Sequence, residues 1–164
     1  MEVNAAVRSA TIDDFAAVCE LSQALDDLHV RLRPDLFQEF DGPPRSLEFI
    51  ARWIGGEDSE LLVAQVGEDV AGLATIQIAD RPRAPMFRPR QCAVINDLVV
   101  SESYRGYGIG KLLLKAAADW ASERGVPSLN ISVWNDNEGG VSFFTANGFA
   151  PICQRMELRI DEAK

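Results

Sequence analysis

The feature that most constrains this chain is a glycine-rich turn between an apolar run and an amphipathic segment. Residues 92–100 read Cys-Ala-Val-Ile-Asn-Asp-Leu-Val-Val, which is typical of a buried strand. Gly106, Gly108 and Gly110 alternate in the turn that follows. The next apolar residues recur at helical spacing: Ile109, Leu112, Leu113, Ala116 and Trp120. The sequence therefore predicts a strand, a tight turn and a helix, with the glycines at the helix start.

A turn of this kind is able to bind phosphate. Glycine allows positive φ and a close approach of the backbone to a ligand. Amides at the positive end of a helix dipole then form an anion-binding concavity, to which Arg105 and Lys111 add charge. The glycine spacing differs from the nucleoside-triphosphate loop and from the dinucleotide fingerprint. On the turn alone, a phosphate site and a turn without a ligand are equally open.

The other segments predict an α/β domain. Strands are expected at Val3–Arg8, Leu61–Val66, Val70–Ala79, Cys92–Val100, Leu129–Trp134 and Met156–Ile160. Helices are expected after the caps Thr11 and Ser46, after the glycine turn, and at Asn137–Asn147. Arg81–Arg90, with three prolines and four arginines, is expected to be a loop. This order predicts one domain over residues 1–164, with a mixed sheet and helices on both faces.

Composition excludes several classes of function. The net charge of -9 makes nucleic acid an unlikely partner, since an acidic surface repels phosphate backbones. It would favour a cationic substrate, although many acidic surfaces serve only solubility. No apolar run approaches the ~20 residues of a membrane span, and the N-terminus lacks the pattern of a signal peptide. The three cysteines match no zinc spacing. We expect a cytoplasmic protein without metal and without membrane contact.

Two motifs resemble a known family. Arg105-Gly106-Tyr107-Gly108-Ile109-Gly110, after a strand ending Asp97-Leu98-Val99-Val100, resembles the central Gln/Arg-x-x-Gly-x-Gly/Ala motif of the GNAT superfamily of N-acetyltransferases. Residues 133–149 look like the Asn-x-x-Ala-x-x-Phe-Tyr…Gly-Phe segment of that family. The resemblance covers nearly the whole chain. It implies a GNAT-like, mostly antiparallel sheet with splayed central strands, and acetyl transfer from acetyl-CoA to a primary amine by direct attack.

The resemblance also implies where acetyl-CoA binds. The backbone of Leu98, Val99 and Val100 would lie along the pantetheine arm. The pyrophosphate would be held by Arg105, Gly106, Tyr107, Gly108, Ile109, Gly110 and Lys111. The thiol end would be flanked by Asn137, Gly140, Phe143 and Phe144. The family usually has alanine where this chain has Gly140, and a close approach of the backbone to the ligand would explain the glycine. Asn137 also suits a helix N-cap.

The chain departs from the family at both usual acid–base positions. Phe144 stands where many members have a tyrosine that protonates the CoA thiolate, and Asn96 stands where a carboxylate is common. Three possibilities follow. The enzyme relies on proximity, strand amides and water; another residue serves, with Asp97, Tyr104 and Tyr107 as candidates; or the chain binds acyl-CoA without fast turnover. Asp97 is our candidate base, with a structural carboxylate as the alternative.

His29, the single histidine, is a second candidate base. It follows the first helix, in a connection that walls the acceptor site in the family, although a histidine at a helix end is also a common surface or capping residue. Acids gather near it: Asp26, Asp27, Asp35, Glu39 and Asp41. They would attract a cationic amine or form a solvated face. The sequence leaves open whether the acceptor is a small molecule or a peptide, which acyl chain is preferred, and whether the protein forms the homodimer common in the family.

Overall fold

A computed structural model describes residues 3–80, 85–88 and 90–160. The loop expected at Arg81–Arg90 therefore lies partly outside the described residues. The chain divides into two compact units, Met1–Ser132 and Val133–Lys164, and each is considered by itself. The single domain over residues 1–164 stays a prediction. In the described part of the chain, no helix is both long enough and apolar enough to cross a membrane.

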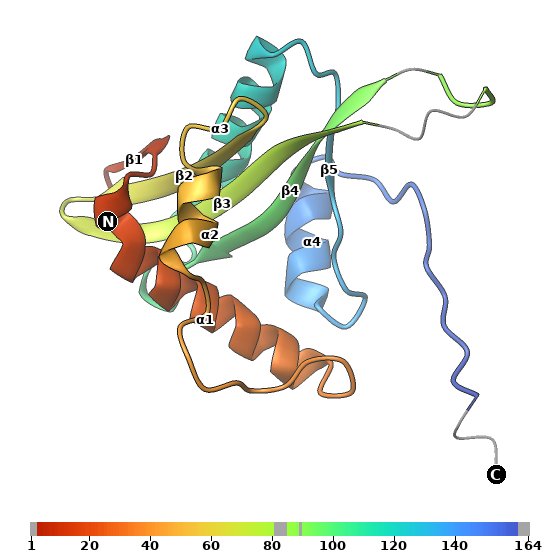
Figure 1. Cartoon of the computed structure of the whole chain (residues 1–164), viewed down its shortest axis with the longest axis horizontal. Coiled ribbons are helices and arrows are strands. Elements are labelled where there is room, and N and C mark those ends of the chain that lie inside the picture. The colour runs from red at the N-terminus through yellow and green to blue at the C-terminus, as the bar shows by residue number, and fades with distance from the viewer. Residues whose placement is uncertain (1–2, 81–84, 89, 161–164) are drawn as a thin grey trace. The chain divides into compact units, whose positions relative to one another are not determined.

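The first unit is built on a sheet of five described strands that follow one another in chain order (Figure 1). They are β1 (Ala5–Ser9), β2 (Ser59–Val66), β3 (Asp69–Asp80), β4 (Gln91–Val100) and β5 (Leu129–Ile131). The first three pairings are antiparallel, and β4 pairs with β5 in parallel. A parallel pair needs a long crossover, which α3 (Ile109–Glu123) provides. The predicted mixed, mostly antiparallel sheet is confirmed.

Helices cover both faces of this sheet (Figure 1). One face carries the 3-10 turn η1 (Ile12–Asp14) with α1 (Phe15–Leu32) and α2 (Leu47–Trp53), and the other carries α3. The first face is packed through one buried cluster: Ala10, Val18, Leu21, Ile50, Leu61, Val63, Leu73 and Val99. Towards the sheet α3 buries Ile109, Leu113, Leu114, Ala117, Trp120 and Ala121. Leu112 is 39% exposed, so the apolar face of α3 is rotated from the predicted one.

Local hydrogen bonds set the helix starts. The Ser46 side chain accepts from the amide of Phe49 at 3.1 Å and caps α2, as predicted. At η1 the amide of Thr11 donates to the Asp14 carboxylate at 2.8 Å. The Arg8 guanidinium donates to both oxygens of that carboxylate at 2.8 Å and holds the pKa of Asp14 below its usual range. This ion pair joins β1 to the start of the helical segment.

The second unit holds α4 (Glu138–Ala146). Two strands predicted near the C-terminal end differ from the structure, one just before this unit and one within it. The strand predicted at Leu129–Trp134 ends at Ile131, where β4 stops pairing with β5. Met156–Ile160 is not a strand, and residues 149–160 contain no helix or strand. The alternating apolar residues Met156, Leu158 and Ile160 predicted a strand. A strand also requires a hydrogen-bonded neighbouring strand, and in the described residues none pairs with this segment.

Candidate functional site

β4 changes its pairing halfway along its length. Ile95 lies opposite Ile76 of β3 and Asp97 lies opposite Thr75, so Asn96 is an extra residue, a β-bulge. On its other side β4 pairs with β5 only from Ala93 to Ile95. Among the described residues, no strand pairs with that edge from residue 96 to 100. The two central strands therefore separate at the bulge, as expected for splayed strands, and leave an open backbone edge.

The glycine turn begins just beyond this open edge, after the short turn η2 (Glu102–Tyr104). Gly106 and Gly108 have φ of 81° and 80°, a region that favours glycine, and Gly108 precedes α3. Leu112 is the first residue of α3 whose amide reaches a carbonyl, that of Gly108 at 3.1 Å. The amides of residues 106–111 find no acceptor within the described part of the chain. They form a row of free donors at the positive end of the helix.

The surroundings of this row fit a multiply charged anion. A Cβ atom added at Gly106 or Gly108 would meet no atom within 4 Å, so open space lies beside both. Ile109, only 1% exposed, anchors the turn in the core. Arg105 and Lys111 are exposed, and Arg105 Nε donates to the Val100 carbonyl at 3.3 Å. Free amides, space and two cations together make a site that suits a pyrophosphate.

The remaining residues of the motif have distinct places. Gly110 is the second residue of α3 and lies within its helical backbone, while Tyr107 is 45% exposed. Tyr104 donates its hydroxyl to Asp69 of β3 at 2.5 Å. This hydrogen bond raises the pKa of Tyr104. Tyr104 therefore ties the turn to the β2–β3 hairpin, a role that its candidacy as an acid did not foresee.

Asp97 lies at the bulge and is held by Thr75. The Thr75 hydroxyl donates to Asp97 Oδ2 at 3.1 Å and accepts from the Asp97 amide at 3.0 Å. Thr75 is 4% exposed and Asp97 is half-buried. A cavity of about 510 Å³ opens beside the carboxylate, and its lining is Pro44, Arg45, Ser46, Phe49, Trp53, Asn96 and Asp97. The bulge and the start of α2 thus line a solvent-open hollow beside Asp97.

Arg45 also lines this cavity, a position that no sequence pattern had indicated. Its guanidinium binds both oxygens of Asp26, with Nη1–Oδ2 at 2.9 Å and Nη2–Oδ1 at 3.1 Å. Burial acts to lower the pKa of Arg45, but its hydrogen bonds to Asp26 and the nearby carboxylate charges outweigh burial and raise it. Asp26 lies on α1 and Arg45 is the residue before the α2 cap, 19 positions later, so no local pattern links them.

His29 lies apart from this cavity. It occupies the last turn of α1, and its ring stacks on Phe37 with centroids 5.1 Å apart. His29 is not among the residues that line the 510 Å³ cavity. The predicted acidic face is partly neutralised, because Asp26 binds Arg45 and Asp35 binds Arg33. No group of three or more histidine, cysteine, aspartate or glutamate side chains in the described residues is placed to hold a metal ion.

The residues predicted at the thiol end of acetyl-CoA belong to the second unit. The Asn137 side chain accepts from the Gly140 amide at 3.0 Å and caps α4. A Cβ added at Gly140 would lie 2.6 Å from Asn137 Nδ2, so a larger residue there would require the capping side chain to shift. Phe144 contacts Phe143 and Phe149 edge to face, with centroids 5.2 and 5.4 Å apart. The role of these residues beside the cofactor stays a prediction.

Known proteins share this sequence pattern. The family model described as Acetyltransferase (GNAT) family matches residues 23–149. Streptothricin acetyltransferase from Streptomyces lavendulae is 34% identical over 94 residues, which are 57% of this chain and 46% of that protein. The chain therefore spans less than half the length of this curated relative.

Solved structures share the fold. A mutant of the BH1408 protein from Bacillus halodurans superposes with a TM-score of 0.89 and 28% identity, covering 94% of this chain and 99% of that one. A protein described as a predicted acetyltransferase with acetyl-CoA, from Clostridium acetobutylicum, has a TM-score of 0.71 and 16% identity, covering 96% and 97%. At that identity the second likeness speaks for the fold alone. The family match, which covers most of the chain, shows that this protein belongs to the GNAT family of acetyltransferases.

Proposed function

We propose that the protein transfers an acetyl group from acetyl-CoA to a primary amine by direct attack. One observation carries the proposal: the free amides of residues 106–111 lie in the turn that follows the open edge of β4. The free amides suit a pyrophosphate, and the open strand edge suits an extended chain that contains amides. Acetyl-CoA joins these two groups in one molecule, and an acetyl-CoA-bound protein of the same fold supports the assignment.

Each part of the cofactor has residues that suit it. The amides of Gly106–Lys111, with Arg105 and Lys111, would hold the pyrophosphate. The backbone of Leu98, Val99 and Val100 would pair with the pantetheine arm along the open edge. Bound acetyl-CoA supplies an activated thioester carbonyl. The contribution of the protein is to orient that group and to exclude competing geometries, so that proximity lowers the barrier.

The amine must lose a proton before it attacks. An alkylamine has a pKa of roughly 10 and arrives charged. Asp97 is the carboxylate that lines the cavity, and its neighbour Asn96 cannot accept a proton. We assign proton acceptance to Asp97, directly or through water, with His29 as the second candidate. Phe144 has no acidic proton, so we assign protonation of the departing thiolate to water.

The setting of the reaction is also part of this proposal. We place the protein in the cytoplasm, acting without a metal on a small-molecule or peptide amine and not on nucleic acid or membranes. The similarity to streptothricin acetyltransferase makes amine-bearing antibiotics one acceptor group to include in any screen. A homodimer is proposed by analogy with the family.

One alternative has a specific observation in its favour. Phe144 and Asn96 lack the groups that usually move protons in this family, which suits a non-catalytic acyl-CoA-binding or regulatory module. A thiol-release assay with acetyl-CoA separates the two functions. The amine panel should include simple alkylamines, amino acids, aminoglycosides, streptothricin and peptides with free N-termini, with an amine-free reaction as control. Amine-dependent thiol release supports the enzyme, whereas CoA binding without release by any amine supports the module.

A further inference from the structure

We propose that the 510 Å³ cavity between α2 and the β4 bulge is the acceptor site, and that it selects an ammonium group carried beside an aromatic or similar apolar group. The proposal rests on the proposed acetyl transfer and specifies its substrate class. Its lining combines one carboxylate, two aromatic rings and one guanidinium: Asp97, Phe49, Trp53 and Arg45. The charges of these groups favour an ammonium group in the ligand, and the two rings favour an apolar group beside it.

The charge of the site favours a cation. Arg45 is the one positive residue in the lining, and both of its terminal nitrogens are held by Asp26. The Asp97 carboxylate, together with the Arg45 guanidinium and the Asp26 carboxylate that holds it, gives this region a net charge of about -1. Asp97 Oδ2 accepts from Thr75, and the structure shows no partner for Oδ1 among the described residues. That oxygen is available to an ammonium group, and a charged hydrogen bond of this kind is stronger than a neutral one.

The rings favour an apolar group next to the charge. Phe49 and Trp53 are one helical turn apart on α2, with centroids 6.3 Å apart and planes inclined by 55°. Phe49 is 38% exposed, although α2 also has a buried side at Ile50. Aromatic faces attract cations and cover flat apolar groups. An arylalkylamine satisfies both the carboxylate and the rings.

The same arrangement disfavours a free carboxylate on the acceptor. Such a group would meet the charge of Asp97, and it could bind Arg45 only by competing with the bidentate hydrogen bonds of Asp26. An α-amino acid should therefore bind less well than the amine that lacks its carboxylate. Arg45 acts here as a positioning residue for the α2 wall, since its Cζ also lies 5.8 Å from the centroid of the Phe49 ring.

Ligand titrations followed by NMR test the site without turnover. The probe is the indole N–H signal of Trp53, assigned by its loss in Trp53→Phe, with the buried Trp120 signal as an internal control. We expect 2-phenylethylamine to bind at least about tenfold more tightly than ethylamine, which lacks the ring, or 2-phenylethanol, which lacks the charge. Phenylalanine should bind more weakly than 2-phenylethylamine. In Asp97→Asn the preference for the amine over the alcohol should fall to within about threefold.

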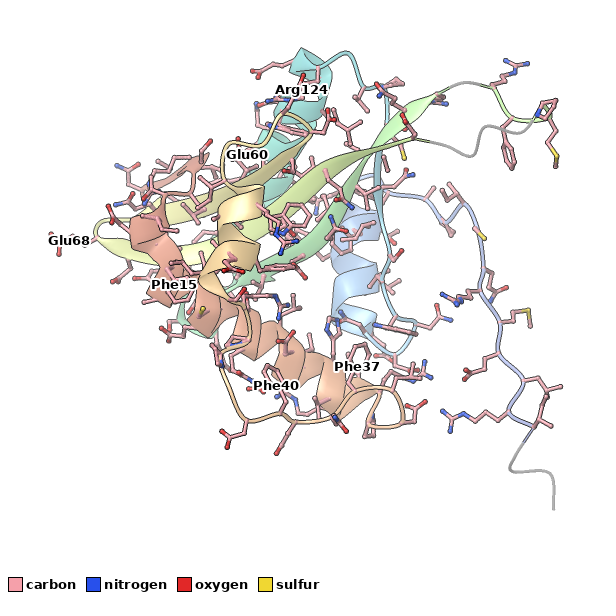
Figure 2. The ribbon with its side chains drawn as sticks, viewed as in Figure 1. Phe15, Phe37, Phe40, Glu60, Glu68 and Arg124 are labelled. Atoms are coloured by element: carbon pink, nitrogen blue, oxygen red, sulfur yellow. The ribbon has the colours of Figure 1, made fainter. Side chains whose placement is uncertain are left out.

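Variants and turnover complete the test. Trp53→Ala should weaken 2-phenylethylamine binding by about tenfold. The matched change Phe40→Ala, on the α1–α2 connection and outside the cavity lining, should leave it unchanged (Figure 2). Equal affinities for 2-phenylethylamine, ethylamine and 2-phenylethanol would overturn the proposal, as would tighter binding of phenylalanine. Selective binding without thiol release would instead count against the proposed transfer and leave the cavity assignment standing.

Discussion

The two halves of β4 differ in how they are held, although they form one continuous strand. Residues 93–95 pair with β3 on one side and with β5 on the other, and Ala93 and Ile95 are buried. Residues 97–100 pair with β3 alone, after the bulge at Asn96. In the first half, both edges of β4 are hydrogen-bonded to neighbouring strands. In the second half, past the bulge, the β5-facing edge of β4 has no strand partner among the described residues.

The largest effect should come from the turn that follows the open half. Gly108→Asp puts bulk and negative charge beside the free amides, and we expect CoA affinity to fall by at least about 100-fold. Isothermal titration calorimetry with CoA measures it. Gly125→Asp is the matched control, since Gly125 also has positive φ, 70°, but lies past the far end of α3. Equal losses in the two variants would show that backbone strain, and not the site, explains the result.

Substitutions in the first half of β4, residues 93–95, should lower stability rather than cofactor affinity. Ile95 is 2% exposed, and Ile95→Ala should lower the free energy of unfolding by about 2–4 kcal/mol through lost burial and a cavity. Urea denaturation measures this change, and Val94→Ala, at a half-buried position, should cost less. CoA affinity of the folded variant should stay within about threefold of wild type, which is under 1 kcal/mol. A large loss of affinity with intact stability would mean that the halves are not separate in function.

Asp97 lies on the open half and should affect chemistry more than stability. Asp97→Asn should lower kcat/KM for an alkylamine by about tenfold or more at pH 7. The loss should be smaller at pH 9, where a larger share of an amine with a pKa of roughly 10 is already neutral. Initial rates of thiol release at both pH values give the comparison. An equal loss at both, in a variant that melts like wild type, would leave Asp97 as a structural partner of Thr75.

The Arg8–Asp14 ion pair lies on neither half of β4 and should make a pH-dependent contribution to stability. The pKa of Asp14 is lowered in the folded protein by the Arg8 hydrogen bonds. Its contribution is therefore present above the unfolded value of about 3.9, and it is lost as the pH falls through the lowered folded value. Asp14→Asn should cost about 1–2 kcal/mol at pH 7 and progressively less below pH 4. Chemical denaturation across pH measures this, with exposed Asp13→Asn expected to change little.

The smallest effect is expected at Phe144. If this residue stands where the family places its acid, Phe144→Tyr should change kcat by less than about tenfold and in the upward direction. Steady-state thiol release at saturating acetyl-CoA and amine measures kcat. A large decrease would mean that the added hydroxyl disrupts the contacts of Phe144 with Phe143 and Phe149, and that the alignment gives the wrong role to this position.

The sequence predicted what depends on local patterns. The alternation of glycines between a strand and a helix located the turn, and helical spacing located α1 and α3. Contacts between distant segments were missed, such as Arg45 with Asp26 and Tyr104 with Asp69, because no spacing links such partners. Period-two apolarity at Met156–Ile160 wrongly predicted a strand, since pairing depends on a neighbour that the pattern cannot specify. The assignment of Gly140 to the cofactor stays a prediction, and the structure adds that Gly140 packs closely against its capping residue Asn137.

The central claim is that the open half of β4 and the glycine turn together hold acetyl-CoA. Backbone amide spectra recorded during a CoA titration test it residue by residue. The account predicts saturable shifts at Leu98–Val100 and at Gly106–Lys111, with little change at Ala93–Ile95, which β3 and β5 already occupy. Shifts confined to other segments, or equal shifts in both halves of β4, would contradict it.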